Sequence, residues 1–143
     1  AEFEMLAATE SNVGRLEAAG VLTALSTVGA NTAPGEHVVK QYAGNLVAIG
    51  KVPGSSGLDW GHALATITSG PAEAIGMGGE IGSLRAGRRA DVVIWDGDPL
   101  ELSSAPVAIY IDGRAQPRTS RQTKLRDRYM TPSEGALPKA YER

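Results

Sequence analysis

The sequence contains no cysteine among its 143 residues, and it has two histidines, His37 and His62, far apart along the chain. The absence of cysteine excludes a disulfide framework and thiolate metal sites. The histidines form neither a His-x-His pair nor an HExxH motif. The sequence therefore shows no recognisable metal site of its own, although it does not settle the cellular compartment.

Aromatic residues make up only 5% of the chain, and the formal net charge is −2. This balance gives no overall attraction to nucleic acid or to an anionic membrane. The longest apolar runs are far shorter than a membrane span. We therefore predict a soluble protein, cytoplasmic or periplasmic, that binds neither nucleic acid nor membrane.

The main concentration of positive charge lies near a basic helix that the pattern predicts at Ser120–Met130. We interpret these side chains as a solvated helix face, because aromatic residues that could stack on bases are not interleaved with them. The residues are Arg118, Arg121, Lys124, Arg126 and Arg128.

The first part of the chain predicts a helix followed by a buried strand. Residues 13–19 carry apolar side chains at three-residue spacing, with Ser11 or Asn12 as a possible cap and Gly20 just past the helix end. The short apolar run Val21–Thr27 suits a buried strand.

Two further helices are predicted beyond the turn-rich loop Val28–Glu36. His37 opens a pattern with apolar residues at four-residue spacing, typical of a helix that packs on one face. Leu58–Met77 is also helical in pattern, with a break expected near Gly70-Pro71. This alternation favours α/β architecture with parallel strands.

The second half changes to short strands bounded by glycines, as in an antiparallel sheet. The predicted strands are Ile81–Leu84, Val92–Trp95 and Val107–Ile111. Asp112-Gly113 is a strong signal for a two-residue hairpin turn, so Arg114–Gln116 should return beside the preceding strand.

The connection between the last two strands contains three carboxylates, Asp96, Asp98 and Glu101. Asp98, Pro99 and Glu101 have the spacing of a helix capping box. A calcium loop is the alternative, but the full series of oxygen ligands is absent. We interpret these residues as turn-formers.

Two segments resemble nucleotide-binding motifs but do not match them, and the hydrolase elbow motif is absent. The third glycine of GMGGEIG, Gly76–Gly82, falls one position too late, and the segment precedes a predicted strand rather than a helix. GNLVAIGKV, Gly44–Val52, lacks the spacing and the Ser or Thr of a phosphate loop. No G-x-S-x-G elbow surrounds Ser55 or Ser56.

Three stretches together resemble the C-terminal part of the amidohydrolase superfamily, and within it the imidazolonepropionase-like amidohydrolases. They are ALATITSGPAEAIGM, EIGSLRAGRRADVVIWDGDPLE and VAIYIDGRAQP. The family's T-x-x-P-A-x-x-x-G pattern stands at Thr68–Gly76, and its GSL-x-x-G-x-x-AD segment begins at Gly82. The resemblance extends from Ser11 to Tyr129.

The resemblance implies an α/β fold that combines the last strand and helices of a (β/α)8 barrel with C-terminal strands of a small β-sandwich. A complete barrel needs about 250 residues, so the barrel here would be incomplete. We expect a terminal βα part over residues 1–78, a sandwich segment over 79–118, and a C-terminal helix and tail over 119–143.

The resemblance also implies a site at the end of the last barrel strand, where the family carries a metal-binding aspartate. Val28 stands at that position and cannot bind a metal or move a proton. The pocket candidates from the loop are Asn31, Glu36 and His37. Either Glu36 or His37 substitutes for the aspartate, or the parent protein is divergent or inactive. The alternative for His37 is a helix-start residue that interacts with nearby backbone.

Two functional hypotheses follow. The leading one is a C-terminal fragment of a metal-dependent amidohydrolase that hydrolyses amide-like C–N bonds of a small molecule and is not catalytic alone. The parent would hold a divalent metal, zinc above all, with the missing N-terminal part of the barrel as the partner of this chain. The alternative is a non-catalytic module that associates with itself or another protein through exposed sheet edges.

Overall fold

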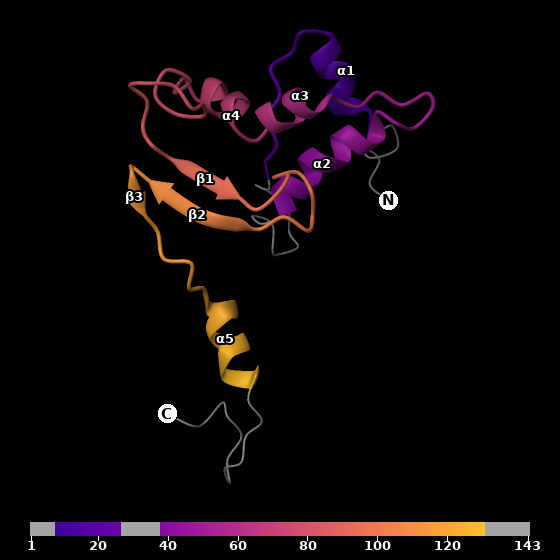
Figure 1. Cartoon of the computed structure of the whole chain (residues 1–143). Helices are drawn as coiled ribbons and strands as arrows, with labels where there is room; N and C mark the ends of the chain where they lie inside the picture. The colour runs from indigo at the N-terminus through magenta and orange to yellow at the C-terminus, as the bar shows by residue number, and fades with distance from the viewer. Residues whose placement is uncertain (1–7, 27–37, 131–143) are drawn as a thin grey trace.

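The computed structural model describes residues 8–26 and 38–130. In chain order its elements are α1 (Asn12–Ala18), α2 (Val39–Ile49), α3 (Trp60–Ala65), α4 (Ser69–Ala74), β1 (Val92–Trp95), β2 (Pro106–Ile111), β3 (Arg114–Ala115) and α5 (Arg121–Met130). Helices α1 to α4 gather on one side of the three-stranded sheet, and α5 stands apart from both (Figure 1).

Helix α1 begins and ends close to the predicted positions. Ser11 occupies the N-cap position, but its side chain does not cap the helix. Its hydroxyl instead accepts a hydrogen bond of 2.9 Å from the backbone N–H of Ser56, which ties the helix to the loop after α2. Gly20 ends the helix with a φ of +75°, in the left-handed region that glycine adopts easily.

The predicted strand Val21–Thr27 is wrong for the residues that the structure describes, 21–26, which pair with no strand. Leu25 donates its backbone N–H to the carbonyl of Thr66 at 2.9 Å, which connects this run to the end of α3. A strand is defined by a ladder of bonds to a neighbour, and the described part of the chain provides no neighbouring strand for this run.

A small hydrophobic core holds α2 against α3 and the turn after β1. Its buried members are Ala43, Leu46, Ala63 and Leu100. The four-residue spacing of apolar residues predicted the buried position of Leu46, but Tyr42, one turn earlier, is 48% exposed. Two of these four residues are alanines, whose short side chains let the backbones approach closely.

The helical region Leu58–Met77 breaks earlier than the sequence predicts. Helix α3 ends at Ala65, and α4 begins at Ser69, ahead of Gly70-Pro71. Thr66 and Thr68 turn their hydroxyls back onto the carbonyls of Ala63 and Leu64, at 2.7 and 2.8 Å. Pro71 therefore lies within the first turn of α4, where its missing N–H costs no helical bond.

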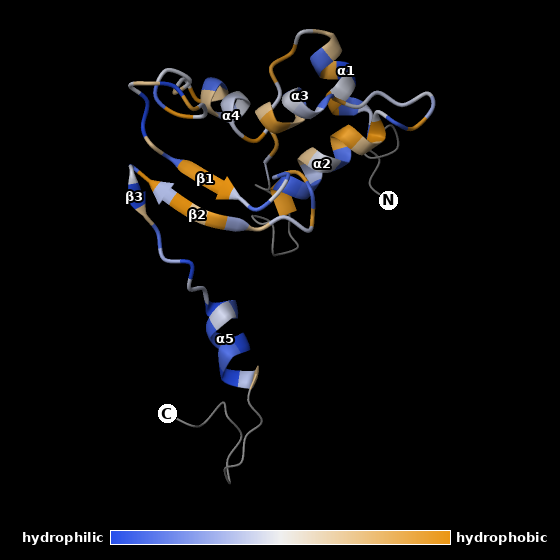
Figure 2. Cartoon of the chain, viewed as in Figure 1, coloured by the Kyte–Doolittle hydropathy of each residue, from blue (hydrophilic) through white to orange (hydrophobic). Residues whose placement is uncertain are grey.

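The sheet has the strand order β1-β2-β3 and is antiparallel throughout. Val92 opposes Tyr110, and Ile94 opposes Ala108, with an irregularity before Trp95. The predicted strands β1 and β2 are confirmed, and no ladder joins them to residues 21–26. Apolar residues colour β1 and β2 orange, whereas α5 is mostly blue (Figure 2).

The third predicted strand of the second half, Ile81–Leu84, is wrong. Gly82 has a φ of +81°, which a strand residue does not adopt. Both Glu80 and Ile81 donate backbone N–H groups to the carbonyl of Met77, and Arg89 donates to Glu80. These bonds fold residues 77–89 into successive turns.

The carboxylates between β1 and β2 form turns, as predicted, but the capping box starts no helix. Asp98 accepts the backbone N–H of Leu100 at 2.9 Å, and Asp96 accepts that of Ala105 at 2.8 Å. Glu101 and Ser104 then close two turns in succession. The chain returns to pair with β1 at Pro106, which leaves no length for a helix.

The hairpin turn between β2 and β3 yields a direct prediction. Asp112 and Gly113 have φ values of +52° and +71°, the combination of a type I′ turn. We expect Gly113→Val to lower the free energy of unfolding by about 1 kcal/mol or more, because a β-branched residue resists positive φ. Urea unfolding measures this, and a midpoint equal to that of the unmodified chain would contradict the turn assignment.

Candidate functional site

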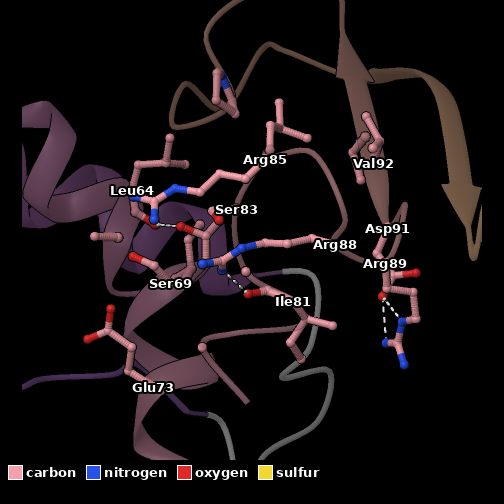
Figure 3. Close-up of a pocket in the computed structure, with 18 of the residues that line it drawn as sticks. Leu64, Ser69, Glu73, Ile81, Ser83, Arg85, Arg88, Arg89, Asp91 and Val92 are labelled. Carbon is pink, nitrogen blue, oxygen red and sulfur yellow. Dashed lines mark hydrogen bonds and ion pairs between the residues drawn. The ribbon is translucent and has the colours of Figure 1, made fainter. Parts of the chain in front are cut away.

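The described residues enclose one notable hollow, of about 840 Å³, between α3, α4, the turns that follow α4, and β1 (Figure 3). Most of its walls are apolar. The apolar and aromatic residues that line it include Leu64, Ile67, Ile81, Leu84, Val92 and Trp95. No sequence pattern predicts this hollow, because residues 81–84, within the turns 77–89, have the pattern of a strand.

Three polar side chains stand out on the walls of this hollow. Arg85 and Arg88 extend across it toward the junction of α3 and α4 (Figure 3). Arg88 donates one guanidinium N–H to the carbonyl of Ile81 at 3.1 Å. The hydroxyl of Ser83 is buried and has no hydrogen-bond partner among the described residues.

An ion pair joins Arg89 and Asp91, two of the residues that line the hollow. Arg89 donates from Nε and Nη2 to Oδ2 of Asp91, at 2.7 and 2.5 Å. The other carboxylate oxygen accepts the backbone N–H of Asp112 at 2.9 Å. The bond from Arg89 is the main cause that lowers the pKa of Asp91, followed by that backbone bond. Asp91 thus connects Arg89, on the wall of the hollow, to the β2–β3 turn.

An exposed carboxylate–imidazole pair marks the start of α3. Asp59 caps the helix by accepting the backbone N–H of His62, and its Oδ2 lies 2.6 Å from Nδ1 of His62. The side-chain bond to Asp59 raises the pKa of His62, while the backbone bond from His62 is the first cause that lowers the pKa of Asp59. The side chain of His62 is 64% exposed.

Removing this pair should change the titration of His62. We expect Asp59→Asn to lower the pKa of His62 toward its ordinary value of 6.5, because the bonded anion is lost. The favourable contribution of His62 is present below pH 6.5 and is lost as pH rises through its raised pKa, whereas that of Asp59 is lost as pH falls. Solvent exposure keeps the effect on stability small.

Nuclear magnetic resonance titration of the His62 ring measures this change directly. Glu73→Gln is a suitable control, because it also removes one carboxylate but does not contact His62. An unchanged pKa of His62 in Asp59→Asn would contradict the contact between the two side chains.

Lys40 connects α2 to the turn after β1. Lys40 donates from Nζ to the carbonyls of Glu101 and Ser104, both at 2.7 Å. The same ammonium lies 5.0 Å from the centre of the Trp95 ring. No sequence motif marks such a residue, because its carbonyl partners lie more than sixty positions away.

The predicted pocket residues Asn31, Glu36 and His37 lie outside the described residues, as does Val28. The structure therefore leaves their roles as predictions. Across residues 8–26 and 38–130, no group of three or more His, Cys, Asp or Glu side chains is placed to hold a metal ion. In the same ranges, no helix is long and apolar enough to cross a membrane.

A model of the amidohydrolase family matches residues 8–115. The chain belongs to the amidohydrolase family. The match covers the run 21–26, the hollow and the whole three-stranded sheet. The predicted resemblance to the superfamily is thus confirmed, while the finer likeness to imidazolonepropionase-like members stays a prediction.

Two individual amidohydrolases show the same likeness. Amidohydrolase tasK of Hapsidospora irregularis is 50% identical over 60 residues, which make up 42% of this chain and 6% of that protein. The crystal structure of an amidohydrolase from Thermotoga maritima MSB8 superposes with a TM-score of 0.69 at 26% identity. The superposed part covers 82% of this chain and 28% of the Thermotoga chain.

Proposed function

We propose that this chain is the C-terminal part of a metal-dependent amidohydrolase that hydrolyses amide-like C–N bonds of a small molecule, and that it is not catalytic by itself. The observation that carries the proposal is the difference in coverage with the Thermotoga amidohydrolase. The likeness covers 82% of this chain but 28% of the other. Most of an amidohydrolase of that size therefore has no counterpart here.

In this proposal the chain provides structure around a site built elsewhere. Residues 1–78 complete a barrel, 79–118 supply part of a β-sandwich, and 119–143 form the C-terminal helix and tail. The segment 21–26 would gain strand neighbours in the complete barrel. Exposed apolar side chains support this, since Val21 and Leu22 are 46% and 53% exposed and apolar side chains in a barrel strand are normally covered.

A divalent ion such as zinc would lower the pKa of a bound water and so supply the nucleophile. The described residues do not fit such an ion, because no group of three possible ligands lies together among them. We propose that the ligands come from the earlier barrel strands. Asn31, Glu36 and His37 would face that site from the loop, where Val28 cannot act as ligand or base.

A second candidate function is a non-catalytic module that associates through its sheet. It is favoured by the exposure of apolar side chains on both strands of the hairpin, among them Ile94 at 48% and Ile111 at 53%. The mass of the chain in solution separates the candidates, because this module would form a defined oligomer.

The sequence encoded upstream of Ala1 tests the leading proposal. We expect further βα units and a His-x-His pair at the end of a predicted strand, as the family resemblance implies. A start codon directly before Ala1, or an unrelated domain there, would contradict it. This test requires no folded protein and is independent of the stability of the chain.

A further inference from the structure

Two arginines in the hollow have no acidic partner among the described residues. The ion pairs formed there are His62–Asp59, Arg89–Asp91 and Arg126–Asp127. Arg85 and Arg88 belong to none of them, yet both extend toward the same part of the hollow (Figure 3). Two like charges directed into one space favour an anion between them.

The buried hydroxyl of Ser83 adds a third group that can bind an anion. Its oxygen has no partner in the described part of the chain, and a buried hydroxyl without a hydrogen bond is destabilising. Ser83 lines the hollow together with both arginines. Arg88 donates one N–H to the carbonyl of Ile81, so its other guanidinium N–H groups can bind an anion. A guanidinium presents its donors in a planar fork that matches the two oxygens of a carboxylate or phosphate.

The rest of the hollow suits an apolar group. Its volume of about 840 Å³ falls in the range of small-molecule pockets, about 300–1,000 Å³. Leu64, Ile67 and Leu84 line it, and Leu84 is 81% exposed. Burial of such side chains under a ligand is favourable, because it removes apolar surface from water.

We propose that this hollow binds a small organic anion. Arg85, Arg88 and Ser83 hold its carboxylate or phosphate group, and its apolar body covers Leu64, Ile67 and Leu84. Glu73 also lines the hollow, but its carboxylate lies apart from the two guanidinium groups in Figure 3. That position directs the anionic end of the ligand to the arginines. The residues that line this site lie within 61–99, and the inference does not depend on the hydrolytic proposal.

Titration of the full chain with three probes of similar size tests this inference. Phenyl phosphate and benzoate carry the two possible anionic groups, and benzamide is the neutral counterpart of benzoate. At constant ionic strength, we expect saturable binding of at least one anion and none of benzamide. The tighter of the two anions identifies which oxyanion the site prefers.

Variants locate the site. Arg85→Gln is expected to weaken binding of the preferred anion by about tenfold or more, through loss of a charge-assisted bond. Within the described residues the Arg85 side chain forms no hydrogen bond or ion pair, so the variant should keep the unfolding midpoint of the unmodified chain. Arg121→Gln, which removes the same charge from exposed α5, should bind the anion as the unmodified chain does. Ser83→Ala should also weaken binding.

Three results would overturn the inference. One is the absence of saturable binding by either anion. Another is equal binding of benzamide and benzoate, which would mark the hollow as apolar only. The third is equal weakening by Arg85→Gln and Arg121→Gln, which would indicate general charge attraction rather than a site.

Discussion

Gly57→Ala is expected to lower the free energy of unfolding by about 3 kcal/mol, the upper part of the usual range for inserting a methyl group into a packed site. An added Cβ at Gly57 would lie 2.2 Å from the nitrogen of Gly50 and 2.4 Å from the carbonyl oxygen of Leu46. Both neighbours are backbone atoms at the end of α2, so no flexible side chain can move aside.

The surroundings of Gly57 hold it in place from two sides. Leu58 donates its backbone N–H to the same Leu46 carbonyl at 2.9 Å. On the other side, a Cβ at Gly14 of α1 would lie 2.3 Å from the carbonyl oxygen of Ser56. The loop is thus confined between α1 and α2, and a shift that relieves one clash creates another.

Urea unfolding followed by circular dichroism measures the effect. Gly79→Ala is the matched control, because nothing lies within 4 Å of the added Cβ at that position. We expect the control to change the midpoint little. A Gly57→Ala midpoint close to that of the control would show that the loop does not pack on α2 as described.

Gly44→Ala is the second substitution with a large expected effect, and here two contributions oppose each other. Gly44 lies inside α2, where alanine is favoured over glycine by about 1 kcal/mol. The added Cβ would, however, lie 2.5 Å from the carbonyl oxygen of Leu100. We expect the steric cost to dominate and the net loss of stability to be about 2 kcal/mol.

The Leu100 carbonyl cannot easily move away from an added Cβ, because hydrogen bonds hold its turn on both sides. Its backbone N–H is bonded to Asp98, and Lys40 of α2 binds the carbonyls of Glu101 and Ser104. If the clash moves this turn away, the bonds of Lys40 are lost as well. The double variant Gly44→Ala/Lys40→Met should therefore cost less than the sum of the two single variants.

Gly61→Ala is the helical control for Gly44→Ala. Gly61 lies in α3, and its added Cβ would meet only Asp59 Oδ1, at 3.4 Å. This variant is expected to be neutral or stabilising by up to about 1 kcal/mol. Equal effects of the two helical substitutions would contradict the close approach of α2 to Leu100, and strict additivity in the double variant would contradict the shared turn.

The sequence predicted those elements whose signals are local. The start and end of α1, the two main strands, the Asp112-Gly113 turn and helix α5 all follow from residues within a few positions of one another. The positive φ values of Gly20 and Asp112 show why this works, since glycine and aspartate tolerate a conformation that most residues avoid.

The failures arose where distant contacts decide the structure. Val21–Thr27 has the composition of a buried strand, but a strand also needs a neighbour to pair with. Ile81–Leu84 has an apolar residue at each end, yet the positive φ of Gly82 and the bonds to Met77 fold it into turns. Asp98 has a capping spacing but is engaged by Leu100 and by the indole of Trp60.

The candidate site was predictable only in part for the same reason. Family motifs identified the amidohydrolase relationship partly from the segment Gly82–Pro99, which supplies many of the residues that line the hollow. The hollow itself depends on where Arg85, Arg88 and Ser83 meet α3 and α4. No periodicity or short motif in the sequence predicts these contacts between separate segments.

Zinc titration of the purified chain, combined with a hydrolysis assay on N-acyl amino acids, tests the central claim that catalysis resides outside this chain. The account predicts no stoichiometric zinc binding at micromolar concentration and no hydrolysis, because catalytic zinc generally needs about three protein ligands and Val28 replaces the aspartate that the family resemblance implies. Stoichiometric binding at micromolar affinity that is lost in His37→Ala, together with hydrolysis by the chain alone, would contradict it.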